Sequence, residues 1–360
     1  MRVKGFIILV MIFGILLLLV FQQKKKEQKS FDEMQAAGEV LFYPEFDPDR
    51  VAHIKVLKVN DSVDMIKEGG YWMVSDIGMT PMLMEKIDES TDDGEEGAEI
   101  EGPPPDPEYK YYRAEETLVI DGLLNAIDIM KREERVSHDP GKHTSFYVLN
   151  SIVGIEVLAE DADGNELAHL IVGKASEPIP TYTYVRDFNE DDVYQVKQPL
   201  QNMLSIPFNA WRDKIIFNFD KGSINRLTFK HADDGDLEFI IDENGAWSGV
   251  NVNWNVNGSN LDSVLDKFSY LRASDFAPPH LQREEMGLTS PEQSLIASGL
   301  EGSYELILGA LSDTGLYYCT AGHDESVFTM NEPDIRAIFI GKDKLELIES
   351  LDPDELADSS

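Results

Sequence analysis

The amino-acid sequence predicts an α+β fold: two tandem homologous repeats of antiparallel sheet plus helix, preceded by one N-terminal transmembrane helix. Three observations lead to this prediction. Two stretches of alternating apolar residues, typical of strands, end at a tryptophan, Trp72 in one and Trp247 in the other. Further along the chain, each tryptophan is followed by apolar residues spaced three apart, as in a helix that packs on a sheet. The chain also begins with a long uncharged segment, residues 5–21.

Residues 5–21 read GFIILVMIFGILLLLVF. As a helix they span about 26 Å at ~1.5 Å per residue, within the lower range for a membrane-crossing helix. The residues that follow offer no small side chains for cleavage, which favours an uncleaved signal anchor over the alternative, a cleaved secretory signal. Basic residues flank both sides, so the charge rule leaves the orientation open. The short tail, residues 1–4, favours an extracytoplasmic body over a cytoplasmic one.

The composition shifts along the chain predict its division into segments. After the short tail and the transmembrane anchor, we expect a polar stalk, a first α+β repeat, a second repeat and an acidic tail. Their predicted ranges are 1–4, 5–21, 22–43, 44–210, 211–345 and 346–360.

The chain is strongly acidic, with a formal net charge of −36. Residues 1–30 hold six of the 31 Lys and Arg side chains and one of the 67 Asp and Glu, so the body is more acidic still. Such a body repels nucleic acid, which we exclude as a partner. Residues 85–108 contain eleven acidic residues and three consecutive prolines. This composition predicts a disordered insertion, either a solvated loop or a docking segment for a basic partner.

Several local patterns define the elements of each repeat. Thr117 and Asn260 are the predicted N-caps of the two helices. The Asp-Gly turn in residues 161–165 predicts a hairpin. Gly173 and Gly309 mark matching strands of the two repeats.

The candidate chemical sites are weak. His138 and His143, beside an aspartate, are weak candidates for metal ligands, although the Pro and Gly between them favour a loop and no third ligand is visible. The acidic stretches 161–166 and 233–236 resemble fragments of calcium loops, but turn chemistry accounts for them. Cys319 lies in an apolar run and is expected to be buried and unreactive. We therefore expect no catalytic residues, no resident metal and no cofactor.

The sequence resembles the domain-of-unknown-function 4340 family, a bacterial family, over roughly residues 1–345. The resemblance rests on the anchor, on the Trp72 and Trp247 strands, on the glycine pairs Val172-Gly173 and Leu308-Gly309, and on Met286-Gly287-Leu288. The chain departs from the pattern at Phe146-Tyr147-Val148-Leu149, where a Gly-Leu is expected. The resemblance implies a single-pass protein of the bacterial inner (cytoplasmic) membrane, often linked to gliding-type or auxiliary ABC transport systems.

Three functional hypotheses follow. The leading one is a non-enzymatic, extracytoplasmic accessory protein that binds permease or ATPase subunits of an ABC-type transport complex. The second is a module that binds cell-envelope polysaccharide or peptidoglycan, motivated by Tyr182, Tyr184, Phe188 and Tyr194. The third is a metal-dependent hydrolase, motivated only by the His138 and His143 loop.

Overall fold

The computed structural model describes residues 40–78, 109–177, 179–231, 235–322 and 325–347. The chain divides into two compact units, Met1–Asp213 and Lys214–Ser360, which we call the first and second domains. The predicted anchor and the acidic insertion lie outside the described residues. Within the described ranges, no helix is long and apolar enough to cross a membrane.

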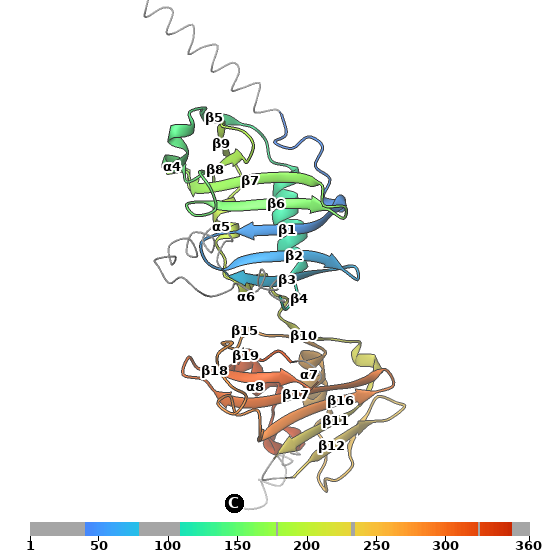
Figure 1. Ribbon diagram of the computed structural model, residues 1–360. Helices are drawn as coiled ribbons and strands as arrows, with labels where there is room; N and C mark the ends of the chain where they lie inside the picture. The colour runs from blue at the N-terminus through green and yellow to red at the C-terminus, as the bar shows by residue number, and fades with distance from the viewer. Residues whose placement is uncertain (1–39, 79–108, 178, 232–234, 323–324, 348–360) are drawn as a thin grey trace, which may run out of the picture. The chain divides into compact units, whose positions relative to one another are not determined.

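The first domain is built on one antiparallel sheet with the strand order β4-β3-β2-β1-β6-β7-β8-β9-β5 (Figure 1). Its strands are β1 (Val51–Leu57), β2 (Ser62–Glu68), β3 (Tyr71–Gly78), β4 (Tyr112–Arg113), β5 (Glu134–Ser137), β6 (Ile155–Asp161), β7 (Glu166–Ala175), β8 (Thr183–Asp187) and β9 (Val193–Val196). Its helical segments are η1 (Pro48–Arg50), η2 (Thr117–Leu124), α3 (Asn125–Asp128), η3 (Pro140–Lys142), α4 (His143–Phe146), α5 (Leu200–Leu204) and α6 (Phe208–Trp211).

The core of the first domain lies between one face of this sheet and the η2–α3 helix, which crosses behind the strands in Figure 1. Successive side chains of a strand point to opposite faces, so alternate residues such as Ile54, Met65 and Leu170 are buried together. Ile127 and Met130, two of the apolar residues that follow Trp72 at a spacing of three, are also fully buried in this cluster.

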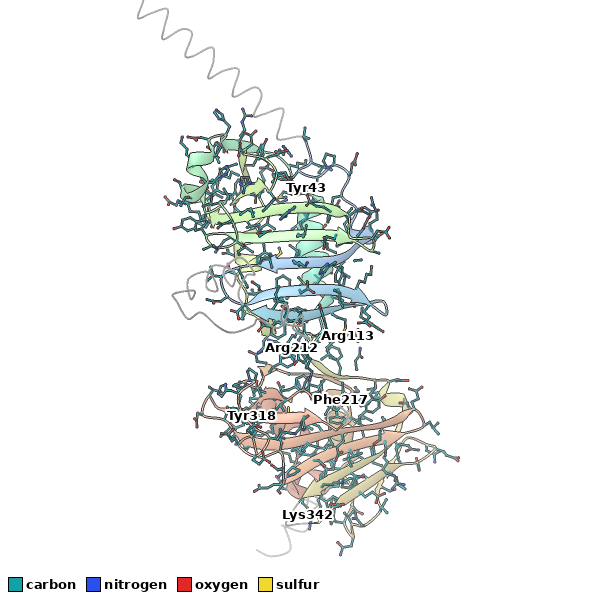
Figure 2. All side chains as sticks on the ribbon, in the orientation of Figure 1. Tyr43, Arg113, Arg212, Phe217, Tyr318 and Lys342 are labelled. Atoms are coloured by element: carbon teal, nitrogen blue, oxygen red, sulfur yellow. The ribbon has the colours of Figure 1, made fainter. Side chains whose placement is uncertain are left out.

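Two boundaries differ from the sequence prediction. The stalk was predicted to reach residue 43, but Phe42 is only 1% exposed and belongs to the core. Tyr43, which is labelled in Figure 2, also belongs to the first domain. Its hydroxyl donates a hydrogen bond to the carbonyl of His169, at 2.8 Å. The end of the first domain was predicted at residue 210, but the chain divides after Asp213 and Trp211 is fully buried in the first core.

The second domain has an antiparallel sheet with the order β13-β12-β11-β16-β17-β18-β19-β15, and a separate pair, β10 and β14. Its strands are β10 (Ile215–Asn218), β11 (Ile224–His231), β12 (Leu237–Ile241), β13 (Trp247–Gly249), β14 (Tyr270–Arg272), β15 (Asp275–Phe276), β16 (Gln293–Gly299), β17 (Gly302–Leu311), β18 (Leu316–Ala321) and β19 (Phe328–Asn331). Its helical segments are η4 (Lys221–Ser223), α7 (Gly258–Ser269), α8 (Glu332–Ile338) and α9 (Lys342–Leu345).

Both predicted helix caps are wrong. Thr117 is the first residue of η2, and the preceding residue makes no capping bond from its side chain. In the second domain Asn257, not Asn260, is the N-cap, and its side chain accepts a hydrogen bond from the N–H of Asn260. The predicted acidic tail also begins too early, because the N–H of Leu347 still donates to the carbonyl of Asn255.

The fold is α+β and mostly antiparallel sheet, and the strand orders of the two domains correspond from β3 and β13 onwards. The registers correspond as well: Ile54 pairs with Met65 in the first sheet, and Leu227 pairs with Phe239 in the second. In this alignment Trp72 and Trp247 occupy the same position. Trp72 is buried, whereas Trp247 is partly exposed and its Nε1 donates to Asp262 at 2.8 Å.

In each domain a short segment crosses the sheet face opposite the main core. Phe146–Val148, the first crossing segment, passes over β7 at Gly173, and Met286–Leu288, the second crossing segment, passes over β17 at Gly309. A Cβ atom at Gly173 would lie 2.1 Å from the carbonyl oxygen of Phe146, and one at Gly309 would lie 2.3 Å from that of Met286. Only glycine therefore permits the crossing.

This contact predicts that Gly173→Ala and Gly309→Ala each destabilise their own domain. The obstructing atom is a backbone oxygen, which cannot swing aside, so we expect a loss of about 1–3 kcal/mol, typical of overpacking. Urea unfolding of the full-length protein measures the loss. Gly122→Ala is the control, because its Cβ would lie 3.6 Å from the nearest atom, an ordinary contact. Equal stability of all three variants would contradict the prediction.

Candidate functional site

The two crossing segments open a cleft at the same place in each domain. In the first domain the register of β7 with β8 shifts between Val172 and Ala175, and in the second that of β17 with β18 shifts between Leu308 and Leu311. A bulge of this kind bends a strand and interrupts its pairing. The cleft lies beside the bulged stretch, and we call it the first or second bulge cleft by its domain.

The first bulge cleft has a volume of about 590 Å³. The strand overhang Gly173–Ala175 lines it, because pairing of β6 with β7 ends at Ile155 and Val172. The other lining residues come from the crossing segment and the loop after it, from the turn between β1 and β2, and from α5: Lys58, Val59, Asn60, Asp61, Tyr147, Ile152, Val153, Gly154, Gln201 and Ser205.

The second bulge cleft has a volume of about 440 Å³ and shares three elements with the first, namely the bulged strand, the crossing segment with the loop after it, and the helix that follows the sheet. Its lining includes Leu308–Leu311 of β17, Gly287 of the second crossing segment, and Ile335 of α8. The N–H of Ala310 donates to the carbonyl of Met286 at 2.8 Å, which fixes the crossing segment on the strand.

The middle residue of each crossing segment has a left-handed backbone. Gly287 has φ +69°, and Tyr147, in the corresponding position, has φ +61°. Glycine adopts this conformation freely, whereas other residues pay on the order of 1 kcal/mol. The departure seen in the sequence, Tyr147 in place of glycine, is therefore a conformationally costly residue at the mouth of the first bulge cleft.

Lys58 holds together two parts of the lining of the first bulge cleft, the β1–β2 turn and α5. Its Nζ donates to the carbonyls of Leu204 and Ile206, at 3.1 and 2.6 Å, at the C-terminal end of α5. A cation at this end of a helix satisfies carbonyls that the helix leaves unpaired. Burial lowers the pKa of Lys58. The charge of Lys58 is thus already used to hold the β1–β2 turn against α5.

The first crossing segment is held by the guanidinium of Arg186 on β8. It donates to the carbonyls of Val148 and Leu149, at 2.8 and 3.1 Å, and also to those of Asp187, Phe188 and Glu190. Arg186 is 7% exposed, and burial lowers its pKa. Five carbonyl acceptors converge on one buried cation, so this side chain fixes the wall of the cleft.

Two histidines on the outer sheet face each lie between two carboxylates. His53 contacts Asp64 through Nε2 at 2.6 Å and Glu160 through Nδ1 at 2.9 Å. His169 contacts Glu156 through Nε2 at 2.9 Å and Glu166 through Nδ1 at 3.2 Å. A ring nitrogen facing a carboxylate must donate a proton, so both rings fit the charged, doubly protonated form.

The pKa shifts agree with this geometry. The hydrogen bond to Asp64 raises the pKa of His53 above 6.5. Burial acts to lower the pKa of His169, but the hydrogen bond to Glu156 and the charges of Glu156 and Glu166 outweigh it and raise the value. Burial acts to raise the pKa of Asp64, but hydrogen bonds from His53 and Tyr111 hold it below its usual range.

The sequence-predicted metal candidates do not come together. His138 is exposed, and His143 begins α4, where its Nε2 contacts the carbonyl of Asp191 at 2.9 Å. The predicted loop between them is partly helical, since η3 and α4 span residues 140–146. No group of three or more metal-ligand side chains occurs among the residues that the structure describes.

Cys319 and three of the four candidate aromatics lie in separate surroundings, and the fourth, Tyr182, is half-buried in the turn before β8. Cys319 is buried on β18, and burial raises the pKa of its thiol to about 12. Tyr194 belongs to the main core, and Tyr184 packs beside the first crossing segment. Phe188 stacks on His169 with ring centroids 3.8 Å apart. These rings do not form one continuous platform.

The comparison with known protein families identifies the chain. The family model described as "Domain of unknown function (DUF4340)" matches residues 107–291, half of the chain. The chain belongs to this family. The match is narrower than the range expected from the sequence, and it contains both crossing segments. No curated protein and no solved structure matches the chain.

The histidine geometry makes stability depend on pH. A histidine whose pKa is raised by folding stabilises the fold fully below its unfolded value, near 6.5, and loses that contribution as pH rises through the folded value. We therefore expect His53→Gln to lower the melting temperature more at pH 6 than at pH 9. Differential scanning calorimetry at the two pH values measures this. His280→Gln, at an exposed position, is the control, and an equal loss at both pH values contradicts the expectation.

Proposed function

We propose that this protein is a membrane-anchored, non-enzymatic accessory protein whose bulge clefts bind other proteins. The observation that carries the proposal is the cleft itself. Val59, Tyr147 and Val153 line the first bulge cleft with 36, 51 and 38% of their surface exposed, and Leu311 lines the second with 55% exposed. Apolar side chains gathered at a concave site on a chain of net charge −36 are typical of a surface that a partner covers.

The two domains are, in this proposal, copies of one ancestral unit. The matching strand orders, the two bulges and the two crossing glycines support the duplication. Duplication supplies two clefts of similar design and leaves each free to change its lining. Such an arrangement suits a protein that holds two partners, or two parts of one partner.

The partner that we propose is an ABC-type transport complex, met on the extracytoplasmic side of the bacterial inner membrane. The apolar residues 5–21 support a single-pass anchor that keeps the domains beside permease subunits. The family resemblance, in which members are linked to auxiliary transport systems, supports the same choice. The alternative, binding of envelope polysaccharide, has less support because the aromatic side chains that suggested it are dispersed.

Photo-crosslinking in intact membranes tests this function. A photoreactive amino acid replaces Val153 at the first bulge cleft or Leu311 at the second, in the full-length protein. We expect both to form adducts with a multi-pass permease or an ATPase subunit, identified by mass spectrometry. Ile129 and Leu300, which are 51 and 94% exposed and line neither cleft, are the matched control positions.

Two outcomes of the crosslinking experiment would contradict the proposal. Adducts of equal yield at the control positions show that the contact is not made through the clefts. Adducts confined to envelope polymer at Val153 and Leu311 favour the polysaccharide alternative instead.

A further inference from the structure

The two domains have side chains of different size and charge at two corresponding positions. Where the second domain has Gly287 and Ala310, the first has Tyr147 and Lys174. The Nζ of Lys174 lies 5.7 Å from the centre of the Tyr147 ring. Both residues line the first bulge cleft, so the two clefts differ in size and charge at these two positions.

The ring of Tyr147 is not required by the fold. The second domain makes the same crossing with glycine, and the Tyr147 side chain, 51% exposed, belongs to neither the main core nor the small cluster under the crossing segment. The left-handed backbone makes a non-glycine residue costly here. Conformational strain that packing does not explain is concentrated at binding and catalytic sites.

Lys174 supplies an available positive charge beside this ring. Its contact with the carboxylate of Glu177 is long, at 3.5 Å, and the Glu177 side chain is 85% exposed. Exposed pairs of this kind contribute little and exchange readily. Lys58, the other lysine of the cleft, is already bound to two carbonyls. A carboxylate that enters the cleft is therefore expected to form an ion pair with Lys174.

We propose, resting on the proposed function, that the first bulge cleft binds an extended polypeptide segment that carries one carboxylate between aliphatic side chains. The overhang Gly173–Ala175 extends beyond β6 and offers strand backbone to an extended chain. Val59 and Val153 contact the aliphatic side chains, Tyr147 covers them, and Lys174 pairs with the carboxylate.

Two observations select a polypeptide rather than an anionic polysaccharide. The exposed apolar lining is mainly aliphatic, with Tyr147 as its aromatic ring, whereas sugar rings stack best on aromatic platforms. The strand overhang suits main-chain pairing, which a sugar cannot make. The net charge of −36 repels an acidic segment at long range, so the segment has neutral or basic flanks and one central carboxylate.

The test uses the full-length protein in detergent and a defined peptide. The probe is fluorescein-labelled Lys-Val-Val-Glu-Val-Val-Lys, and its matched partner has Gln in place of Glu. Fluorescence anisotropy gives the affinities, with an oligouronate as the anionic polysaccharide competitor. We expect at least tenfold weaker binding of the Gln peptide, and no competition by the oligouronate.

Two variants replace Lys174 and Tyr147 with the residue types that the second domain has at the corresponding positions. Lys174→Ala weakens binding of the Glu peptide at least tenfold and makes the Glu and Gln peptides equivalent. Tyr147→Gly weakens it at least tenfold while the melting temperature stays the same or rises, because glycine relieves the backbone. Lys197→Ala and Tyr270→Ala, which remove exposed side chains outside the cleft, leave the affinity unchanged.

Each opposite result overturns the inference: similar affinities for the two peptides, unchanged binding by both variants, displacement by the oligouronate, or a clear fall in melting temperature for Tyr147→Gly. Failure here is separable from failure of the proposed function. If the peptide does not bind but the Leu311 probe still crosslinks to a transport subunit, the inference falls alone. If neither cleft yields such an adduct, the function falls as well.

Discussion

The contact between a strand glycine and a crossing backbone carbonyl is the constraint on which both domains depend. At Gly173 and Gly309 the crossing chain lies closer to the strand than any side chain permits. This approach sets the height of the crossing segment above the sheet. The left-handed residue at its centre, the small apolar cluster beneath it and the cleft beside the bulge all follow from that height. A change in this one contact is expected to move the part of the cleft that the crossing segment forms.

The presence of two such crossings separates what the fold requires from what one domain adds. Both domains keep the glycine, the bulge and the left-handed turn, so these features belong to the architecture. The means of holding the segment differ: the first domain uses the buried guanidinium of Arg186, and the second has Thr320 at the corresponding position on β18. Features found in one domain only, such as Tyr147, are not explained by the shared fold.

Much of the fold follows from local sequence, because strand alternation and turn chemistry act over a few residues. The hairpin of β6 and β7 and the burial of Cys319 were both predicted in this way. The N-cap of α7 was misplaced by three residues because Asn257 and Asn260 both suit a cap, and only the helix geometry decides between them. Phe42 was assigned to the stalk because the preceding residues are polar and the apolar run Val40–Tyr43 is short, while its contacts with the core come from distant parts of the chain.

The site was harder to predict, because its parts come from distant places in the chain. His53 contacts Glu160 only because β1 pairs with β6, and no pattern in the sequence around His53 predicts that contact. The sequence did mark Tyr147 as a departure from the family pattern, but it did not show that the backbone of Tyr147 is left-handed.

The histidines and Lys174 give the acidic first domain a definite charge pattern. Its two sheet histidines offset neighbouring carboxylates, while Lys174, beside the strained tyrosine, keeps only a long contact to an exposed glutamate. The Lys174 ammonium attracts a carboxylate locally, while the net negative charge of the chain repels acidic partners at longer range. The position of a single carboxylate on the partner therefore matters more for binding than the partner's total charge.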